Sequence, residues 1–176
     1  PGTVTYSITL AANGCFGSTV NYAVTVNPQV YITSGPLFQS VCTGFSTWIP
    51  LTSNVTGSTF SWSASGDPGV SGYGAGSGSV INQTLVNVNS TPGNVTYAIT
   101  PTANGCAGVS SNYVVTVNPD PVLFTMAPTG PQCAGTILRL NGSENGLLYI
   151  LRLNGSNIDT ITGTGLVGFL DFGPQY

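Results

Sequence analysis

The feature that most constrains this chain is an internal repeat with a period of 91 residues. Residues 92–119 repeat residues 1–28 without a gap, and 19 of the 28 positions are identical. A period of this length is enough for one small β-sandwich, so it predicts a tandem array of whole domains. We therefore expect the C-terminal strands of a preceding repeat at 1–28, a complete domain at 29–119, and the N-terminal part of a divergent following domain at 120–176.

Alternation of apolar and polar residues predicts strands along the whole chain, and no segment keeps a helical period. The glycine-rich segment 65–80 is expected to form a surface loop, with a weak strand or bulge near 68–76. Six or seven short strands separated by turns favour an all-β fold of tandem, immunoglobulin-like antiparallel β-sandwiches. The strands expected in the complete domain lie near 29–33, 47–53, 58–64, 79–87, 94–101 and 110–118.

The two-residue period of these strands also assigns an inward face. Tyr97 follows Pro92 and Gly93 and fits either a tyrosine corner of an immunoglobulin-like sandwich or an ordinary core position. Trp62 is the candidate for the central core aromatic. The residues expected to face inward are Ile49, Leu51, Phe60, Trp62, Ile81, Leu85, Val95, Tyr97 and Ile99.

The chain is almost uncharged, with 4% charged residues and a formal net charge of −3. Ordinary soluble proteins carry about 25% charged residues. Arg139 and Arg152 are the only cations, so nothing in the sequence neutralises phosphates and nucleic-acid binding is not expected. No apolar run approaches the roughly 18 residues of a membrane span. A neutral surface of Ser, Thr, Asn and Gly is typical of an exposed, long-lived extracellular protein.

The four cysteines fall into two classes, because Cys15 and Cys106, and Cys42 and Cys133, are each separated by the 91-residue period. Four cysteines allow three pairings. A Cys42–Cys106 disulfide is favoured because it joins the early and late cysteines of one domain, and it leaves Cys15 and Cys133 with partners outside the segment. In a strict immunoglobulin-like topology these two positions lie at opposite ends, and bonds between adjacent domains become the alternative.

No catalytic site, cofactor site or metal site is expected. The sequence has no His, no Cys-x-x-Cys pair and no Gly-x-Ser-x-Gly motif. Asp67 and Asp159 are isolated acids, which are more often turn residues than calcium ligands. The segment is therefore not expected to be an enzyme.

Several strings in the chain resemble a known family. They are TxNGCxG followed by xVTVNPxP, VCTG at 41–44, LTSNVTGSTFSWSASG at 51–66, and CAGTILRLNGSENGLLYIL in the third segment. They resemble the PKD-like and immunoglobulin-like tandem repeats of giant cell-surface proteins in Bacteroidota-type bacteria, which include gliding-motility adhesins. The resemblance implies export by the type IX system, display on the cell surface, and O-glycosylation at Asp-Thr-aliphatic sites such as Asp159-Thr160-Ile161, with Thr160 as the acceptor.

The resulting hypothesis is a structural and adhesive repeat segment of a long extracellular filament. Its expected partners are neighbouring repeats, copies of itself and surface polysaccharide. The alternative is an accessory carbohydrate-binding or spacer module of a secreted polysaccharide-degrading enzyme. Coplanar exposed aromatics on one sheet of 29–119 would favour that alternative, and the aromatics considered for sugar stacking or loop packing are Tyr31, Phe38, Phe45 and Tyr73.

Overall fold

A computed structural model of the chain describes residues 1–165 and 168–174, and the regular elements among them are β-strands. The all-β class expected from the sequence is therefore confirmed. The chain forms two compact units, Pro1–Pro119 and Asp120–Tyr176, which are described separately. The first unit holds a hairpin and a sandwich.

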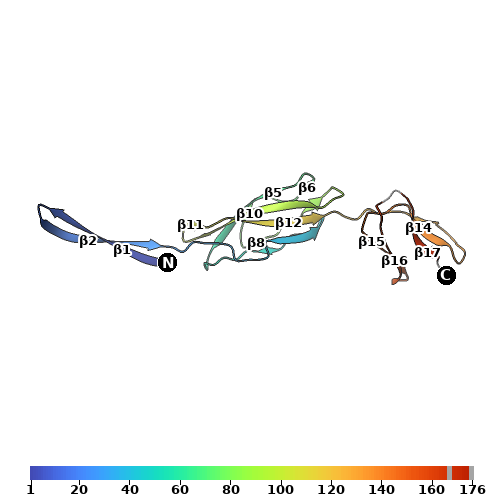
Figure 1. Ribbon diagram of the computed structural model, residues 1–176, viewed down its shortest axis with the longest axis horizontal. Coiled ribbons are helices and arrows are strands. Elements are labelled where there is room, and N and C mark those ends of the chain that lie inside the picture. The colour runs from blue at the N-terminus through green and yellow to red at the C-terminus, as the bar shows by residue number, and fades with distance from the viewer. Residues whose placement is uncertain (166–167, 175–176) are drawn as a thin grey trace. The chain divides into compact units, whose positions relative to one another are not determined.

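The hairpin consists of β1 (Gly2–Ala12) and β2 (Cys15–Val26), drawn in blue in Figure 1. The strands are antiparallel, with Tyr6 opposite Tyr22. Asn13 and Gly14 form the turn with φ of 50° and 79°. Two consecutive left-handed residues match the right-handed twist of the strands they join, which explains the Asn-Gly pair.

The larger sheet of the sandwich has the strand order β3-β12-β10-β5-β7, and β11 extends it by pairing with β10. Figure 1 shows β5, β10 and β12 side by side. The centre of this sheet is the hairpin of β10 and β12, which repeats the pairing of β1 and β2 with Tyr97 opposite Tyr113. The strands of this sheet are β3 (Phe38–Cys42), β5 (Thr59–Gly66), β7 (Gly76–Ser77), β10 (Gly93–Ala103), β11 (Cys106–Ala107) and β12 (Ser111–Asn118).

The facing layer is built from shorter pieces. β4 (Ile49–Pro50) pairs with β8 (Val80–Ile81), and β6 (Val70–Ser71) pairs with β9 (Val86–Asn87). Isolated bridges join Ile32 to Ser53 and Ser46 to Thr84, and the second continues the pairing of β4 with β8. Short strands suffice here because side-chain bonds supplement the ladder: buried Thr47 donates through Oγ1 to the Ile81 carbonyl and accepts from the Gln83 amide.

The core lies between these layers, and the inward faces expected from the sequence are confirmed. Trp62 is 8% exposed, and its Nε1 donates to the Gly74 carbonyl. Tyr97 is fully buried, and its hydroxyl donates to the Gln83 side chain, so it is a core residue and not a tyrosine corner, whose hydroxyl would bond to the backbone. The core residues are Ile49, Leu51, Phe60, Trp62, Val70, Ile81, Leu85, Val95, Tyr97, Ile99, Tyr113, Val115 and Val117.

Two features differ from the sequence expectation. β3 was not expected, and it pairs with β12 in parallel, with Phe38 opposite Val114. The segment 65–80 contains β6, where a weak strand or bulge was expected, but it is more than a surface loop, because it also contains β7 and buries Val70. Gly76 fits there because a Cβ would lie 2.7 Å from the Trp62 ring, so only glycine lets β7 approach the core indole.

The second unit carries two small sheets. One has the order β13-β14-β17 and the other pairs β15 with β16. Among its described residues, the buried apolar side chains are Leu151, Leu170 and Phe172. The strands are β13 (Met126–Ala127), β14 (Ile137–Leu140), β15 (Leu148–Leu153), β16 (Ser156–Thr162) and β17 (Leu170–Pro174).

Candidate functional surfaces

The outer face of the larger sheet is an uncharged hydroxyl surface. The sheet register places Thr96 beside Ser65 and Thr100 beside Ser61 on this face, because their neighbours in sequence point into the core. A side-chain bond of 2.9 Å from Thr116 to Asn94 Oδ1 crosses the same face. Asp67 is the only charged residue of 29–119, and its Oδ2 accepts from the Asn94 amide. This surface offers hydrogen bonds whose strength changes little with salt or pH.

The exposed aromatics of the sandwich do not form one platform. Phe38 is 69% exposed on β3, at the edge of the larger sheet. Trp48 is 67% exposed and lies in the other layer, between buried Thr47 and Ile49. Tyr73 is partly buried against the core, so it is not an exposed stacking residue. Phe38 and Trp48 therefore lie in different layers, and Tyr31 and Phe45 are also exposed, at 51% and 66%.

Trp48 was missed as an exposed aromatic, although the sequence contained the signal. Ile49 and Leu51 were assigned inward, and a two-residue period then places the residue before Ile49 outward. Thr47 on the inward side is fully buried, which matches this alternation.

All four cysteines are free and exposed in the structure, and two of them, Cys42 and Cys106, lie at the ends of the sandwich. Cys42 is paired in register with Asn118 at the end of β12, whereas Cys106 follows the opposite end of the sheet and pairs with Ala103. The eight residues of β12 alone span about 25 Å. A disulfide needs Cα atoms within about 7 Å, so the expected Cys42–Cys106 bond does not fit this fold.

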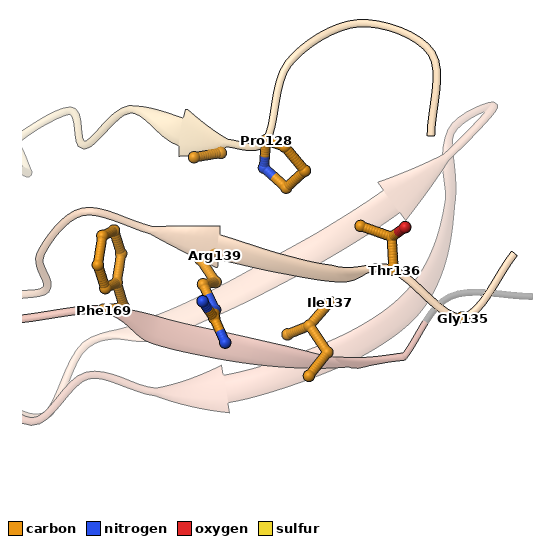
Figure 2. Close-up of a pocket in the computed structure, with 7 residues that line it drawn as sticks. Pro128, Gly135, Thr136, Ile137, Arg139 and Phe169 are labelled. Carbon is orange, nitrogen blue, oxygen red and sulfur yellow. The ribbon is translucent and has the colours of Figure 1, made fainter. Parts of the chain in front are cut away.

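The second unit holds an open cleft of about 540 Å³ beside β14, and Figure 2 shows Ile137 and Arg139 projecting from the same side of this strand. Arg139 lies 5.8 Å from the Phe169 ring centroid and forms an ion pair with Asp171. The Nε–Oδ1 distance of that pair is 3.0 Å. The only cation of the cleft is therefore already neutralised, and the rest of the lining is mainly apolar.

Residues 39–121 match the family model described as the PKD-like domain. The match runs from β3 through the end of β12 and so includes both layers of the sandwich. This segment is a PKD-like domain. A PKD-like domain is typical of an extracellular or cell-surface protein.

No curated protein matches the chain. Among solved structures, the chain is similar to the surface glycan-binding protein SGBP-B from the mixed-linkage glucan utilization locus of Bacteroides ovatus, in complex with a mixed-linkage heptasaccharide. The identity is 19%, the TM-score is 0.36, and the match covers 86% of this chain. It covers 41% of that protein's length, and at this TM-score the likeness supports no functional assignment.

Outside the PKD-like domain, Thr160 is exposed in β16, opposite Ile150. Its backbone amide donates to Asp159 Oδ1, and Asp159 Oδ2 accepts from the Gly173 amide. The hydroxyl of Thr160 therefore stays at the surface, where a glycan acceptor must lie. Modification of Thr160 remains a prediction.

The described part of the chain contains no group of three His, Cys, Asp or Glu side chains placed to hold a metal ion. The carboxylates of Asp67 and Asp159 both accept hydrogen bonds from backbone amides, Asp67 at a turn and Asp159 within β16. No helix within residues 1–165 and 168–174 has the length and apolarity that a membrane span requires.

Proposed function

We propose that the chain is a structural and adhesive repeat segment of a long extracellular cell-surface protein. The observation that carries this proposal is the recurrence of one hairpin. β1–β2 and β10–β12 share most of their sequence and have equivalent register, with Val4 opposite Val24 and Val95 opposite Val115. Tandem copies of one sandwich suit a protein that spans distance and presents surface, since each copy adds length without adding chemistry.

The neutral hydroxyl face supports the adhesive part of the proposal. With Asp67 as its only charge, the PKD-like domain meets little electrostatic repulsion when it approaches another surface or another copy. Beads coated with the protein should therefore bind cells or polysaccharide-coated surfaces with less than about a twofold change between 50 and 500 mM salt, since screening acts only on charges.

Electron microscopy of the native material tests the structural part. Threads that are labelled along their length by antibodies against residues 29–119 would support a filament. Labelling confined to compact particles would contradict it and point to an enzyme appendage.

As part of this proposal, disulfides join neighbouring repeats. Asn27 and Asn118 are equivalent positions, and Asn118 is the register partner of Cys42. Asn27 Nδ2 in turn lies 3.9 Å from Cys106 Sγ. An early cysteine of one repeat and the late cysteine of the next would thus meet near this asparagine. The two thiols would give up two protons and two electrons to a disulfide-bearing oxidant, which is reduced to a dithiol.

A second function is favoured by one observation, the exposed indole of Trp48. An exposed tryptophan on a sheet face is suited to stack on a sugar ring, and the register of Ile49 with Ile81 places Asn82 across from it. Binding of the PKD-like domain to a glycan array, lost in Trp48→Ala and kept in Phe38→Ala, would support an accessory carbohydrate-binding module. An array on which both variants behave like the parent would contradict it.

A further inference from the structure

The β1–β2 hairpin exposes one apolar face, which we call the hairpin face. Its side chains are between 37% and 66% exposed, with Val24 the least and Tyr22 the most exposed. They lie on one side of the hairpin because they occupy alternate positions along each strand, and the register places Val4 opposite Val24 and Tyr6 opposite Tyr22. The hairpin face consists of Val4, Tyr6, Ile8, Tyr22, Val24 and Val26.

The same chain shows this face covered, 91 residues later. The equivalent side chains of β10 and β12 are at most 8% exposed. They lie against Ile49, Leu51, Ile81 and Leu85 in a single core cluster. The equivalent residues are Val95, Tyr97, Ile99, Tyr113, Val115 and Val117.

The outer edges of the two hairpins also differ: those of β10 and β12 are paired with further strands, and those of β1 and β2 are not. In the sandwich, β5 pairs with the outer edge of β10 and β3 pairs with the outer edge of β12. Among residues 1–165 and 168–174, β1 and β2 pair only with each other, so the backbone groups on the outer edge of each strand have no strand partner there. An open edge beside an apolar face is a template for further strands.

We propose that the hairpin face is the docking surface for a segment of the kind formed by residues 29–91, which closes a second PKD-like sandwich around β1 and β2. The proposal rests on the repeat organisation put forward above and adds the surface through which one repeat is completed. The occupant supplies a β5-type strand to β1, a β3-type strand to β2, and an apolar layer over the six side chains.

Two glycines support this occupant over an unspecific apolar partner. A Cβ on Gly93 would lie 2.6 Å from Val70 Cγ2, and a Cβ on Gly108 would collide with the carbonyl of Val30, so both positions need glycine because 29–91 is packed there. The hairpin keeps glycine at the equivalent positions Gly2 and Gly17. Yet Gly2 has nothing within 4 Å of its Cβ position, and Gly17 has only ordinary contacts with Leu10.

The side chain of Gln83 favours a segment of the 29–91 kind as the occupant over the 120–176 unit of a second copy. In the sandwich, Gln83 Oε1 accepts the hydroxyl of buried Tyr97. A segment that buries Tyr6 must offer the same acceptor, because an unpaired buried hydroxyl is costly. At the 91-residue period, the position of Gln83 in 120–176 is Pro174, and that of Leu51 is Gly142. That unit therefore lacks both the acceptor and one of the covering side chains.

The test places a second copy of residues 29–91 directly ahead of Pro1, which reproduces the Thr91–Pro92 junction. Hydroxyl-radical footprinting then compares Tyr6 and Tyr22 in the extended chain and in the 176-residue chain. We expect modification of both tyrosines to fall at least tenfold on extension, to the level of Tyr97 and Tyr113. Unchanged modification of Tyr6 and Tyr22, with Tyr97 still protected, would overturn the proposal.

A matched variant tests whether Tyr6 is protected by direct packing of the added segment on the hairpin face. Ile8→Asp in the extended chain should restore modification of Tyr6 while Tyr97 remains protected, because the charge lies under the added segment only. Sedimentation of the 176-residue chain tests whether a second copy occupies the hairpin face instead. A dimer in which Tyr6 is protected without the added segment would assign the face to a second copy and overturn the proposal. Bead adhesion does not depend on Tyr6, so the adhesive function and the docking on the hairpin face can be contradicted independently of each other.

Discussion

The hydroxyl of Tyr97 donates a hydrogen bond to Oε1 of Gln83 over 2.9 Å and ties the larger sheet to the facing layer. The amide group of Gln83 also bonds to both the N–H and the carbonyl of Gly74, at 3.0 Å each. Trp62 Nε1 donates to the same carbonyl. One glutamine therefore joins the two layers and holds the glycine-rich segment against the core aromatic.

This burial predicts how the domain responds to alkaline pH. Burial raises the pKa of Tyr97 to about 12 from the ordinary value of 10.0. Between these values the unfolded chain loses the tyrosine proton and the folded domain keeps it, so the unfolded state is favoured as pH rises. The free energy of unfolding should be fully retained below pH 10 and fall by about 2–3 kcal/mol by pH 12, at about 1.4 kcal/mol per unit. Urea unfolding at a series of pH values measures this.

Tyr97→Phe provides the control, because it removes the titrating group and keeps the ring. The variant should be less stable at neutral pH by about 1 kcal/mol, the usual contribution of one hydrogen bond. Its stability should fall less between pH 10 and 12 than that of the parent. A parallel fall in both proteins would show that other groups cause the loss; Tyr113, whose pKa is also raised by burial, would be the next candidate.

The internal repeat gives a matched pair of core substitutions. Ile99 is fully buried, and its equivalent Ile8 is 61% exposed. Ile99→Ala should lower the free energy of unfolding of the PKD-like domain by about 2–5 kcal/mol, because it removes buried methylenes and leaves a cavity. Ile8→Ala should change it by less than about 0.5 kcal/mol. Denaturant unfolding followed by near-ultraviolet circular dichroism measures both, and equal effects would contradict the burial difference.

Much of this fold follows from period-2 alternation. Every residue assigned inward from the sequence, from Ile49 to Ile99, is at most 8% exposed. Alternation works here because each long strand has one face in the core and one in water, and a shift of one residue would expose the apolar set. The same rule would have placed Trp48 outward.

The features that the sequence did not predict are short or depend on distant contacts. β7 has two residues, which are too few to show a period. The parallel pairing of β3 with β12 joins residues 76 apart, Phe38 and Val114, and no local pattern encodes it. The placement of Cys42 and Cys106 at opposite ends of the sheet also depends on topology, and it favours the alternative of bonds between adjacent domains.

Gly72 and Gly57 allow two costs of replacing a glycine to be compared: the strain of a left-handed φ and the collision of an added Cβ. Both have left-handed φ, +88° and +80°, which costs any other residue about 1–2 kcal/mol. A Cβ on Gly57 meets nothing within 4 Å, whereas a Cβ on Gly72 would collide with the carbonyl oxygen of Thr84. Gly57→Ala should therefore cost about 1 kcal/mol, and Gly72→Ala at least about 3 kcal/mol. Similar thermal midpoints for the two variants would contradict this packing of 65–80 against Thr84.

The cysteines give a chemical test of the sheet topology. In the folded 176-residue chain, Cys42 and Cys106 should both react with a thiol reagent before reduction, because β12 separates them by more than a disulfide reaches. Cys15 and Cys133 should react as well, since all four are exposed. Mass spectrometry of the labelled, unreduced protein counts the thiols, and Cys42→Ser serves as the control by lowering the count by one. A cross-linked peptide containing Cys42 and Cys106, recovered from monomeric protein, would require the two ends of the sheet to approach each other, and the topology described here would then be wrong.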